Sequence, residues 1–167
     1  ATLKLPPGHG YDLLSTEALL DRATAKGDSI ALPDGMSYRI LAVDLDEDHV
    51  PLAALRKIAQ LKRDGVTVAF GTRIPDRTPG RAQGDEEVRT LARDLWKDSP
   101  SLEQALARKG LKPDFEGPFE STHRRDGDLD LYFVAGAGKG ECTFRVSGAQ
   151  PELWDPVRGT VDTGVPA

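Results

Sequence analysis

The chain has 167 residues, of which 38% are hydrophobic and 29% are charged, with a formal net charge of −5. This composition is that of a folded globular protein, and the length suits one domain or one domain with an appendage. The negative charge argues against nucleic acid as a partner, and because no apolar run approaches the about 20 residues that span a bilayer, we expect a soluble protein.

Strands and one helix are predicted before residue 44. Residues 11–14 are apolar enough for a buried strand, and Ser15 can cap the helix that follows. The turn sequence Pro-Asp-Gly at 33–35 predicts a hairpin with one strand on each side. The apolar run 40–43 does not alternate, which is typical of a strand covered on both faces. We therefore expect the centre of a sheet at 40–43.

A strand–helix–strand unit continues from there. Apolar residues repeat at helical spacing from Leu52 to Leu61, and Gly65 stands where a C-terminal cap belongs. Residues 66–70 read as the next buried strand, and two strands joined by one helix form a right-handed crossover and hence a parallel pair. Beyond a loop, two more helices are predicted, the second with a capping-box pattern at Ser101 and Gln104.

The C-terminal part reads as a β-hairpin. Residues 128–134 alternate, with Leu129, Leu131 and Phe133 on one face. After a glycine-rich turn the same alternation returns at three positions: Cys142, Phe144 and Val146. We predict that these two runs pair and share one apolar side. A lone hairpin is marginal in water, so that side must lie against the rest of the chain or against another domain.

Seven stretches carry a resemblance to a known family: LPPGHGYDLLSTEALLDRA (5–23), ALPDGMSYRILAV (31–43), LRKIAQLKRDGVTVAFG (55–71), DEEVRTLARDLW (85–96), GLKPDFE (110–116), HRRDGDLDLYFVA (123–135) and FRVSGAQPELWDPVRG (144–159). In their order and spacing they resemble glycoside hydrolase family 106, the α-L-rhamnosidase type. The resemblance implies the region after the catalytic barrel, where an amidotransferase-like α/β domain runs into a β-rich part. The family's catalytic carboxylates lie upstream, so no catalytic residue is expected here.

Together these patterns predict an α/β fold. Residues 1–118 are expected to form a small, open, mainly parallel, flavodoxin-like sheet of the class I glutamine amidotransferase type, with helices on both faces. Residues 119–167 are expected to form a β-hairpin appendage that packs on this domain or starts a β-sandwich. Compared with the family pattern, the sequence lacks a strand and a helix before Leu3 and a strand between Trp96 and Ser101.

Asp44 and Asp46 directly follow the predicted central strand, at the end of the sheet where ligands bind in open α/β folds. A strand followed by Asp-x-Asp resembles the haloacid-dehalogenase phosphatase motif, which uses a magnesium ion. The match is incomplete, because Asp48 stands where Thr or Val is usual and no later acidic pair follows another strand. A magnesium-dependent phosphatase-like enzyme is therefore an alternative function, beside a solvated loop that caps a helix.

Other candidate contacts are isolated. His9, between Gly8 and Gly10, and Tyr11 beside them could reach a ligand or a neighbouring domain. Tyr132 and Trp154 could stack on a sugar, which would make the chain a free-standing carbohydrate-binding module, or they could pack against the domain body. The three histidines, at 9, 49 and 123, are expected in loops, and neither a metal nor a cofactor is expected.

The function that the resemblance implies is a non-catalytic accessory domain of an α-L-rhamnosidase-like glycoside hydrolase, supporting its catalytic barrel in carbohydrate degradation. Its partners would be the remaining domains of a larger glycosidase, with carbohydrate as a further ligand. The N-terminal residues do not read as an export signal, and Cys142, the single cysteine, does not identify a compartment. A periplasmic or secreted parent enzyme is compatible with the resemblance.

Overall fold

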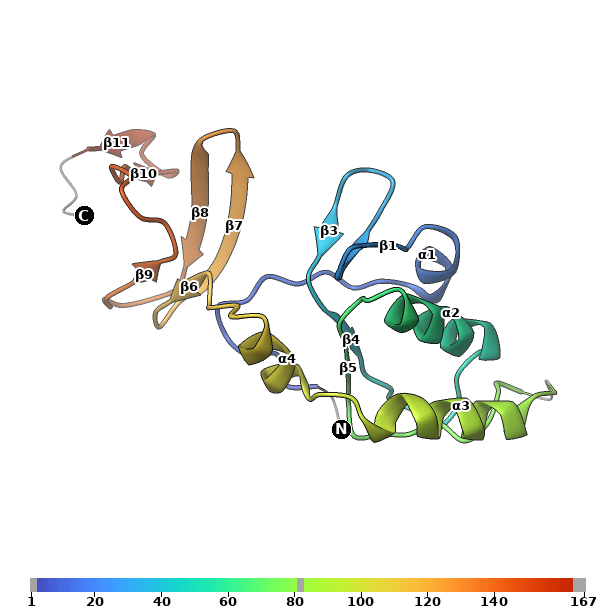
Figure 1. Ribbon diagram of the computed structural model, residues 1–167. Coiled ribbons are helices and arrows are strands. Elements are labelled where there is room, and N and C mark those ends of the chain that lie inside the picture. The colour runs from blue at the N-terminus through green and yellow to red at the C-terminus, as the bar shows by residue number, and fades with distance from the viewer. Residues whose placement is uncertain (1–2, 81–82, 164–167) are drawn as a thin grey trace. The chain divides into compact units, whose positions relative to one another are not determined.

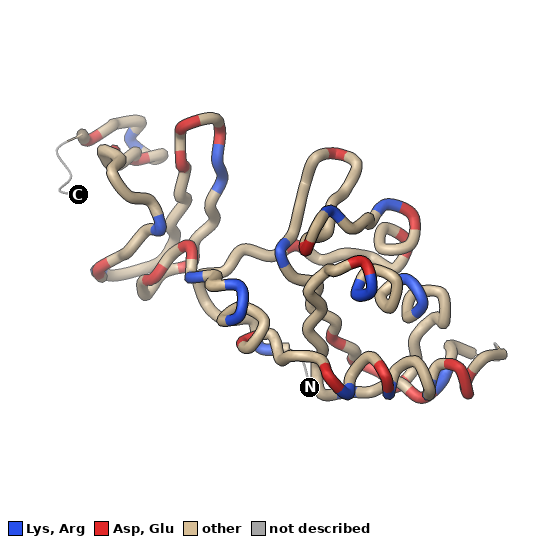
Figure 2. Tube along the Cα trace, in the orientation of Figure 1, with Lys and Arg blue, Asp and Glu red and all other residues tan. Residues whose placement is uncertain are grey.

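The computed structural model describes residues 3–80 and 83–163. These residues divide into two compact units (Figure 1). The first contains the residues up to Pro6 and those from Tyr11 to Lys112, and the second contains Pro7–Gly10 and the chain from Pro113 onward. Acidic and basic residues are interspersed along both units (Figure 2), in keeping with the small net charge of −5.

The first unit has four helices and five strands in the described part of the chain. In chain order they are α1 (Thr16–Asp21), β1 (Thr24–Lys26), β2 (Ser29–Ala31), β3 (Ser37–Tyr38), β4 (Leu41–Val43), α2 (Leu52–Arg63), β5 (Val68–Phe70), α3 (Asp85–Lys97) and α4 (Leu102–Arg108). Strands β1, β2 and β3 form an antiparallel sheet, and β4 pairs with β5 in parallel.

The predicted strand–helix–strand unit is confirmed. Leu41 lies opposite Val68 and Val43 opposite Phe70 in the parallel register, and α2 makes the crossover between the strands. Helix α2 buries one apolar stripe, which includes Leu55 and Ile58, against the main core. The predicted capping box is also present, because the Ser101 side chain accepts from the backbone N–H of Gln104 while the Gln104 side chain accepts from that of Ser101.

The predicted flavodoxin-like, amidotransferase-like sheet is wrong. Within residues 3–80 and 83–163, the parallel sheet has two strands, and the other strands of the first unit form a separate antiparallel sheet. A parallel sheet grows only through further crossovers, whereas here α3 and α4 follow each other with only the short segment 98–101 between them. Residues 11–14 form no strand either, and Leu13 is 92% exposed.

Strand β5 is buried as predicted, but the predicted burial of the strand at 40–43 on both faces is wrong. All three residues of β5 are buried, whereas Ala42 in the middle of β4 is exposed. Helix α4 packs on β5, where Leu102 and Ala105 join Ala69 in a second small core. A continuous apolar run is therefore not sufficient evidence of two-sided burial, because β4 has one side uncovered.

The second unit consists of three two-stranded antiparallel sheets in its described residues. Its strands are β6 (Phe115–Glu116), β7 (Glu120–Asp126), β8 (Leu129–Ala135), β9 (Thr143–Phe144), β10 (Leu153–Asp155) and β11 (Thr160–Asp162). The pairs are β7 with β8, β6 with β9, and β10 with β11. The β7–β8 pair is the longest and stands out as the tall hairpin in Figure 1.

The predicted pairing of 128–134 with 142–146 is wrong. Strand β8 pairs instead with β7 across the turn at Gly127, which adopts a positive φ of 57°. Strand β9 pairs with β6, so that Phe144 lies opposite Phe115. The polar sequence of β7, Glu-Ser-Thr-His-Arg-Arg-Asp, has no apolar alternation and therefore carries no periodic strand signal.

None of the helices in the described ranges is long and apolar enough to cross a membrane.

The core of the first unit leads to a stability prediction. Leu55 is fully buried in α2, so Leu55→Ala should lower the free energy of unfolding of this unit by about 2–5 kcal/mol. Leu13→Ala removes the same atoms from an exposed position and should change it by less than about 0.5 kcal/mol. Urea denaturation of both variants measures the difference, and equal losses would contradict the assignment of the core.

Candidate functional site

Asp44 lies at the carboxyl end of β4, as the phosphatase alternative requires, but its side chain is committed to the fold. Its Oδ2 accepts a hydrogen bond from the backbone N–H of Leu3. Its Oδ1 is buried without a hydrogen-bond partner in the part of the chain that the structure describes. A Cβ at Gly71, the residue after β5, would collide with Oδ1. Asp44 therefore anchors the N-terminal segment at this edge of the sheet.

The acidic loop after Asp44 connects to a second loop. Asp48 accepts a hydrogen bond from the Arg77 side chain at 2.7 Å and, through its carbonyl, from the N–H of Asp76 at 2.9 Å. Asp46 is exposed to solvent. Across residues 3–80 and 83–163, no group of three or more His, Cys, Asp and Glu side chains is arranged to hold a metal ion.

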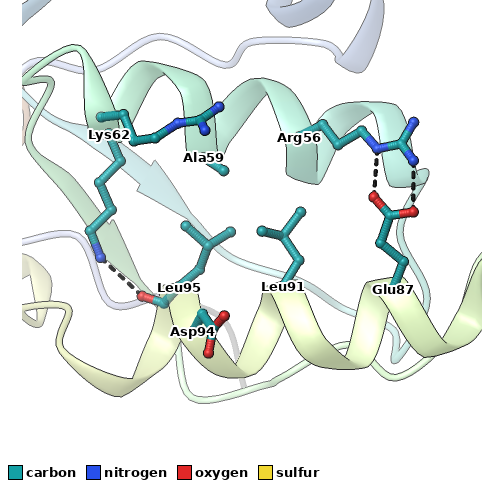
Figure 3. A pocket seen from close by; sticks show the side chains of 8 residues that line it. Arg56, Ala59, Lys62, Glu87, Leu91, Asp94 and Leu95 are labelled. Carbon is teal, nitrogen blue, oxygen red and sulfur yellow. Dashed lines mark hydrogen bonds and ion pairs between the residues drawn. The ribbon is translucent and has the colours of Figure 1, made fainter.

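A groove of about 490 Å³ runs between α2 and α3 (Figure 3). Arg56 donates two hydrogen bonds of 2.7 Å to Glu87, and this contact lowers the pKa of Glu87 and raises that of Arg56. At the other end, Lys62 donates to the carbonyl of Leu95 at 3.2 Å and to the hydroxyl of Ser99 at 2.7 Å. The Arg56–Glu87 ion pair and the hydrogen bond from Lys62 to Leu95 thus tie the two helices together.

A cluster of charged and aromatic side chains surrounds His123 in the second unit. The Nδ1 atom of His123 lies 2.5 Å from Asp114 Oδ2, and the Nε2 atom lies 2.9 Å from Asp130 Oδ1. Arg145 adds a guanidinium group, with Nη2 at 2.7 Å and Nε at 2.9 Å from Asp114 Oδ1. The three side chains of the His–Asp contacts are each about 20% exposed, so the cluster is largely shielded from water.

The register of the β7–β8 hairpin builds this cluster. His123 on β7 lies directly opposite Tyr132 on β8, and the two rings stack in parallel with centroids 4.1 Å apart. Asp130 is two residues before Tyr132 and therefore projects from the same face. Phe144 of β9 meets the Tyr132 ring edge-on at 4.8 Å. The hairpin thus packs its polar side against the β6–β9 pair.

The cluster is arranged to hold charges in place. Both ring nitrogens of His123 lie within hydrogen-bond distance of a carboxylate oxygen, one of Asp114 and one of Asp130. A histidine that acts as a general acid or base needs one nitrogen directed at the reacting group, whereas both are engaged here. His123 therefore connects β7 to β8 and to the segment before β6.

The hydroxyl of Tyr132 is buried beside this cluster and makes no hydrogen bond of normal geometry with the described residues. The neighbouring N–H of Arg145 donates to the Asp114 carbonyl at 3.1 Å. Burial, followed by the negative charges of Asp114 and Asp130, raises the pKa of Tyr132 above its usual 10.0.

The structure distributes the six predicted contact residues over both units. In the first unit, Tyr11 and Asp46 are exposed and Asp44 is half-buried. In the second unit, His9 Nδ1 lies 3.2 Å from the Pro7 carbonyl, and the Tyr132 ring stacks on His123. Trp154 is 64% exposed, and its Nε1 donates a hydrogen bond of 3.0 Å to Glu152. Within the part of the chain that the structure describes, no hydrogen bond, ion pair or ring contact joins any two of the six.

Sequence reasoning missed the cluster because it placed His123 in a loop. His123 lies in strand β7, and the two carboxylates that bind it come from other segments. The Asp126-Gly127 dipeptide is a hairpin turn signal that would have revealed β7 as the partner of β8.

The cluster predicts opposite outcomes for two neighbouring substitutions. His123→Ala leaves the carboxylates of Asp114 and Asp130 without the imidazole that contacts both, and should cost the second unit about 2–4 kcal/mol. Tyr132→Phe removes a buried hydroxyl that makes no normal hydrogen bond, so stability should stay within about 1 kcal/mol or rise. Urea denaturation in a Trp96→Phe background, followed by the fluorescence of the remaining Trp154, compares them, and a larger loss for Tyr132→Phe would refute this description.

The raised pKa of Tyr132 also predicts a dependence on pH. Above about pH 10 the unfolded chain loses the phenol proton first, so the free energy of unfolding falls as the pH rises further. The pKa of Tyr38 is raised by its hydrogen bond to Asp12, so this tyrosine also lowers the free energy of unfolding as the pH rises above about 10. Tyr132→Phe should reduce this alkaline loss, with Tyr11→Phe as the control for removing an exposed tyrosine. Denaturation curves at neutral and at alkaline pH measure the fall in the free energy of unfolding. An identical fall in wild type and in Tyr132→Phe would contradict the prediction.

The fold has a close counterpart among solved structures. The structure of the rhamnosidase from Novosphingobium sp. PP1Y matches 95% of this chain with a TM-score of 0.79 and 28% sequence identity, and the match covers 17% of that rhamnosidase. A curated protein named putative beta-glucuronidase, from Formosa agariphila, is 30% identical over 171 residues, which represent 92% of this chain and 14% of that protein. The chain thus spans less than a fifth of either relative.

The model of glycoside hydrolase family 106, described as alpha-L-rhamnosidase, matches residues 1–164. The match extends over both units and agrees with the solved rhamnosidase, so the predicted resemblance is confirmed. The chain belongs to glycoside hydrolase family 106.

Proposed function

We propose that this chain is a non-catalytic accessory region of an α-L-rhamnosidase-like glycosidase and that it supports the catalytic barrel. The observation that carries the proposal is the match of 95% of this chain to 17% of a rhamnosidase. A region that keeps its fold within a much longer glycosidase serves as one part of that enzyme. The substrate class of the whole enzyme would be α-L-rhamnosides, from the family's description.

The environment of the carboxylates supports a non-catalytic role. Glycoside hydrolysis uses two carboxyl groups that flank the sugar, one as the acid and the other as the nucleophile or base. Asp114 and Asp130 instead share one partner, His123, within a largely shielded cluster. Asp85 accepts from both the N–H and the hydroxyl of Thr78, which lowers its pKa and ties the loop before α3 to that helix. These carboxylates stabilise the fold.

The proposal is tested by assaying the 167-residue chain on aryl α-L-rhamnosides and aryl β-glucuronides. We expect no turnover above the buffer rate, because the proposed role contains no acid–nucleophile pair. A full-length rhamnosidase of the same family serves as the positive control. Turnover by the chain alone, abolished in Asp114→Asn or Asp130→Asn, would show that it is an enzyme and would end the proposal.

A second candidate function is sugar contact through Trp154. Its indole is 64% exposed on β10, and its Nε1 donates to Glu152, which holds the ring in place. An exposed, oriented indole is the kind of platform on which sugar rings stack. Titration with oligosaccharides should then change the tryptophan fluorescence of the wild type but not that of Trp154→Phe. An unchanged signal at about millimolar ligand, the level corresponding to about −4 kcal/mol, would leave this candidate without support.

A further inference from the structure

The β7–β8 hairpin packs its polar face against the rest of the second unit and leaves its apolar face exposed. His123, Asp130 and Tyr132 project from the packed side, where they contact Asp114 and Phe144. The other side carries three apolar residues of β8: Leu129 is 64% exposed, Leu131 47% and Phe133 65%. An antiparallel hairpin at a protein surface ordinarily does the reverse, with the apolar side on the core and the polar side in water.

We call these three side chains, together with the cross-strand neighbours that share their side, the outer face. The register places Asp126 opposite Leu129, Arg124 opposite Leu131, and Thr122 opposite Phe133. The outer face is thus an apolar row along β8, with a polar and charged row beside it on β7. This combination of an apolar centre with a polar margin is characteristic of protein interaction sites.

The inverted orientation is enforced by the charged cluster. Turning the hairpin over, or slipping it by one residue, would exchange its two faces and remove His123 from Asp114. It would also place Arg124 and Asp126 against the β6–β9 pair. There they would lack ionic partners such as those that Asp114 and Asp130 now have on the packed side. Because separating such charges is costly, the exposure of the outer face is a fixed property of the second unit.

Exposure of the outer face to water leaves a large part of the available hydrophobic free energy unused. Full burial of a Leu or Phe side chain contributes about 1.5–3 kcal/mol relative to its exposure, and a two-stranded hairpin by itself is only marginally stable. A partner that covers Leu129, Leu131 and Phe133 would therefore stabilise the hairpin as well as bind it.

We propose that the outer face docks on an apolar surface of a glycosidase domain that lies outside these 167 residues in the same polypeptide. This inference rests on the proposed function. It is supported by the length of the relatives, because the matched region is 17% of the rhamnosidase and 14% of the putative beta-glucuronidase. A domain in the same chain is present at a high effective concentration, so that even a small contact is enough to hold it.

Two other occupants fit the outer face less well. A second copy of the chain would need about 800 Å² from each partner for a stable dimer, far more than three side chains on one hairpin offer. A carbohydrate would need aromatic platforms with hydrogen-bonding groups around them, whereas Phe133 is the only aromatic ring of the outer face and lies beside two leucines. Both remain measurable outcomes of the test.

The test is hydroxyl-radical footprinting of side chains in two samples, the 167-residue chain and a polypeptide that carries it together with the rest of the glycosidase. We expect Phe133 and Leu131 to be labelled readily in the first sample and at least about five-fold less in the second, because docking excludes water from them. Val157, which is 92% exposed in the turn between β10 and β11, serves as the internal reference and should be labelled equally in both.

A variant with Leu129→Thr, Leu131→Thr and Phe133→Thr provides the second measurement, since threonine keeps a high strand propensity while removing the apolar surface. We expect its melting temperature to equal that of wild type in the 167-residue chain and to fall in the longer polypeptide, with Val157→Thr as the matched control. A fall in the 167-residue chain would overturn the proposal, because the outer face would then be covered within this chain.

Three further results would overturn the inference. One is equal labelling of Phe133 in both samples, and another is a dimer of the 167-residue chain that the triple variant abolishes. The third is protection of Phe133 in the 167-residue chain by added rhamno-oligosaccharide. None of these bears on the proposed function, whereas turnover of aryl rhamnosides by the 167-residue chain would end the proposed function and leave the footprinting result as it stands.

Discussion

The contact of His123 with two carboxylates determines how the second unit is organised. Asp114 precedes β6, Asp130 lies on β8, and the imidazole between them belongs to β7, so a single ring joins three segments. Arg145 completes the cluster from the residue after β9. Without His123, both carboxylates would lose a hydrogen-bonding partner in a site that is only about 20% exposed, and such a loss is costly. The packed side of the β7–β8 hairpin is therefore the polar one, and its apolar side is left uncovered.

The first unit depends in the same way on a carboxylate used for structure. Asp44 occupies the end of β4 at which α/β enzymes place catalytic groups, yet it accepts a hydrogen bond from the N–H of Leu3, and a Cβ at Gly71 would collide with its Oδ1. In the described part of the chain, the parallel pair, the crossover helix α2 and an Asp-x-Asp sequence thus occur without the further strands that would form an open α/β sheet. A catalytic motif in the expected place can act only if neighbouring residues leave its side-chain atoms free to bind a ligand, and here the Asp44 side chain is bound within the fold.

Membership of glycoside hydrolase family 106 makes sense of both units together. The proposed accessory role needs stable surfaces more than reactive groups, and the ion pairs of this chain are placed between its own elements, as Arg56 and Glu87 show between α2 and α3. The proposed docking of the outer face on another domain follows the same logic. A hairpin whose orientation is held by charges can present apolar side chains without turning them inward.

The sequence alone was enough to predict the helices, the capping box at Ser101 and Gln104, and the parallel pairing of β4 with β5, because periodicity, caps and short crossovers are local properties of the chain. The resemblance to glycoside hydrolase family 106 could also be recognised from the sequence alone. The partner of β8 and the gathering of Asp114, His123, Asp130 and Arg145 were decided only by the tertiary structure. Strand β7 is polar throughout, so no hydrophobic period marks it, and a charged cluster depends on which backbone edges pair in three dimensions.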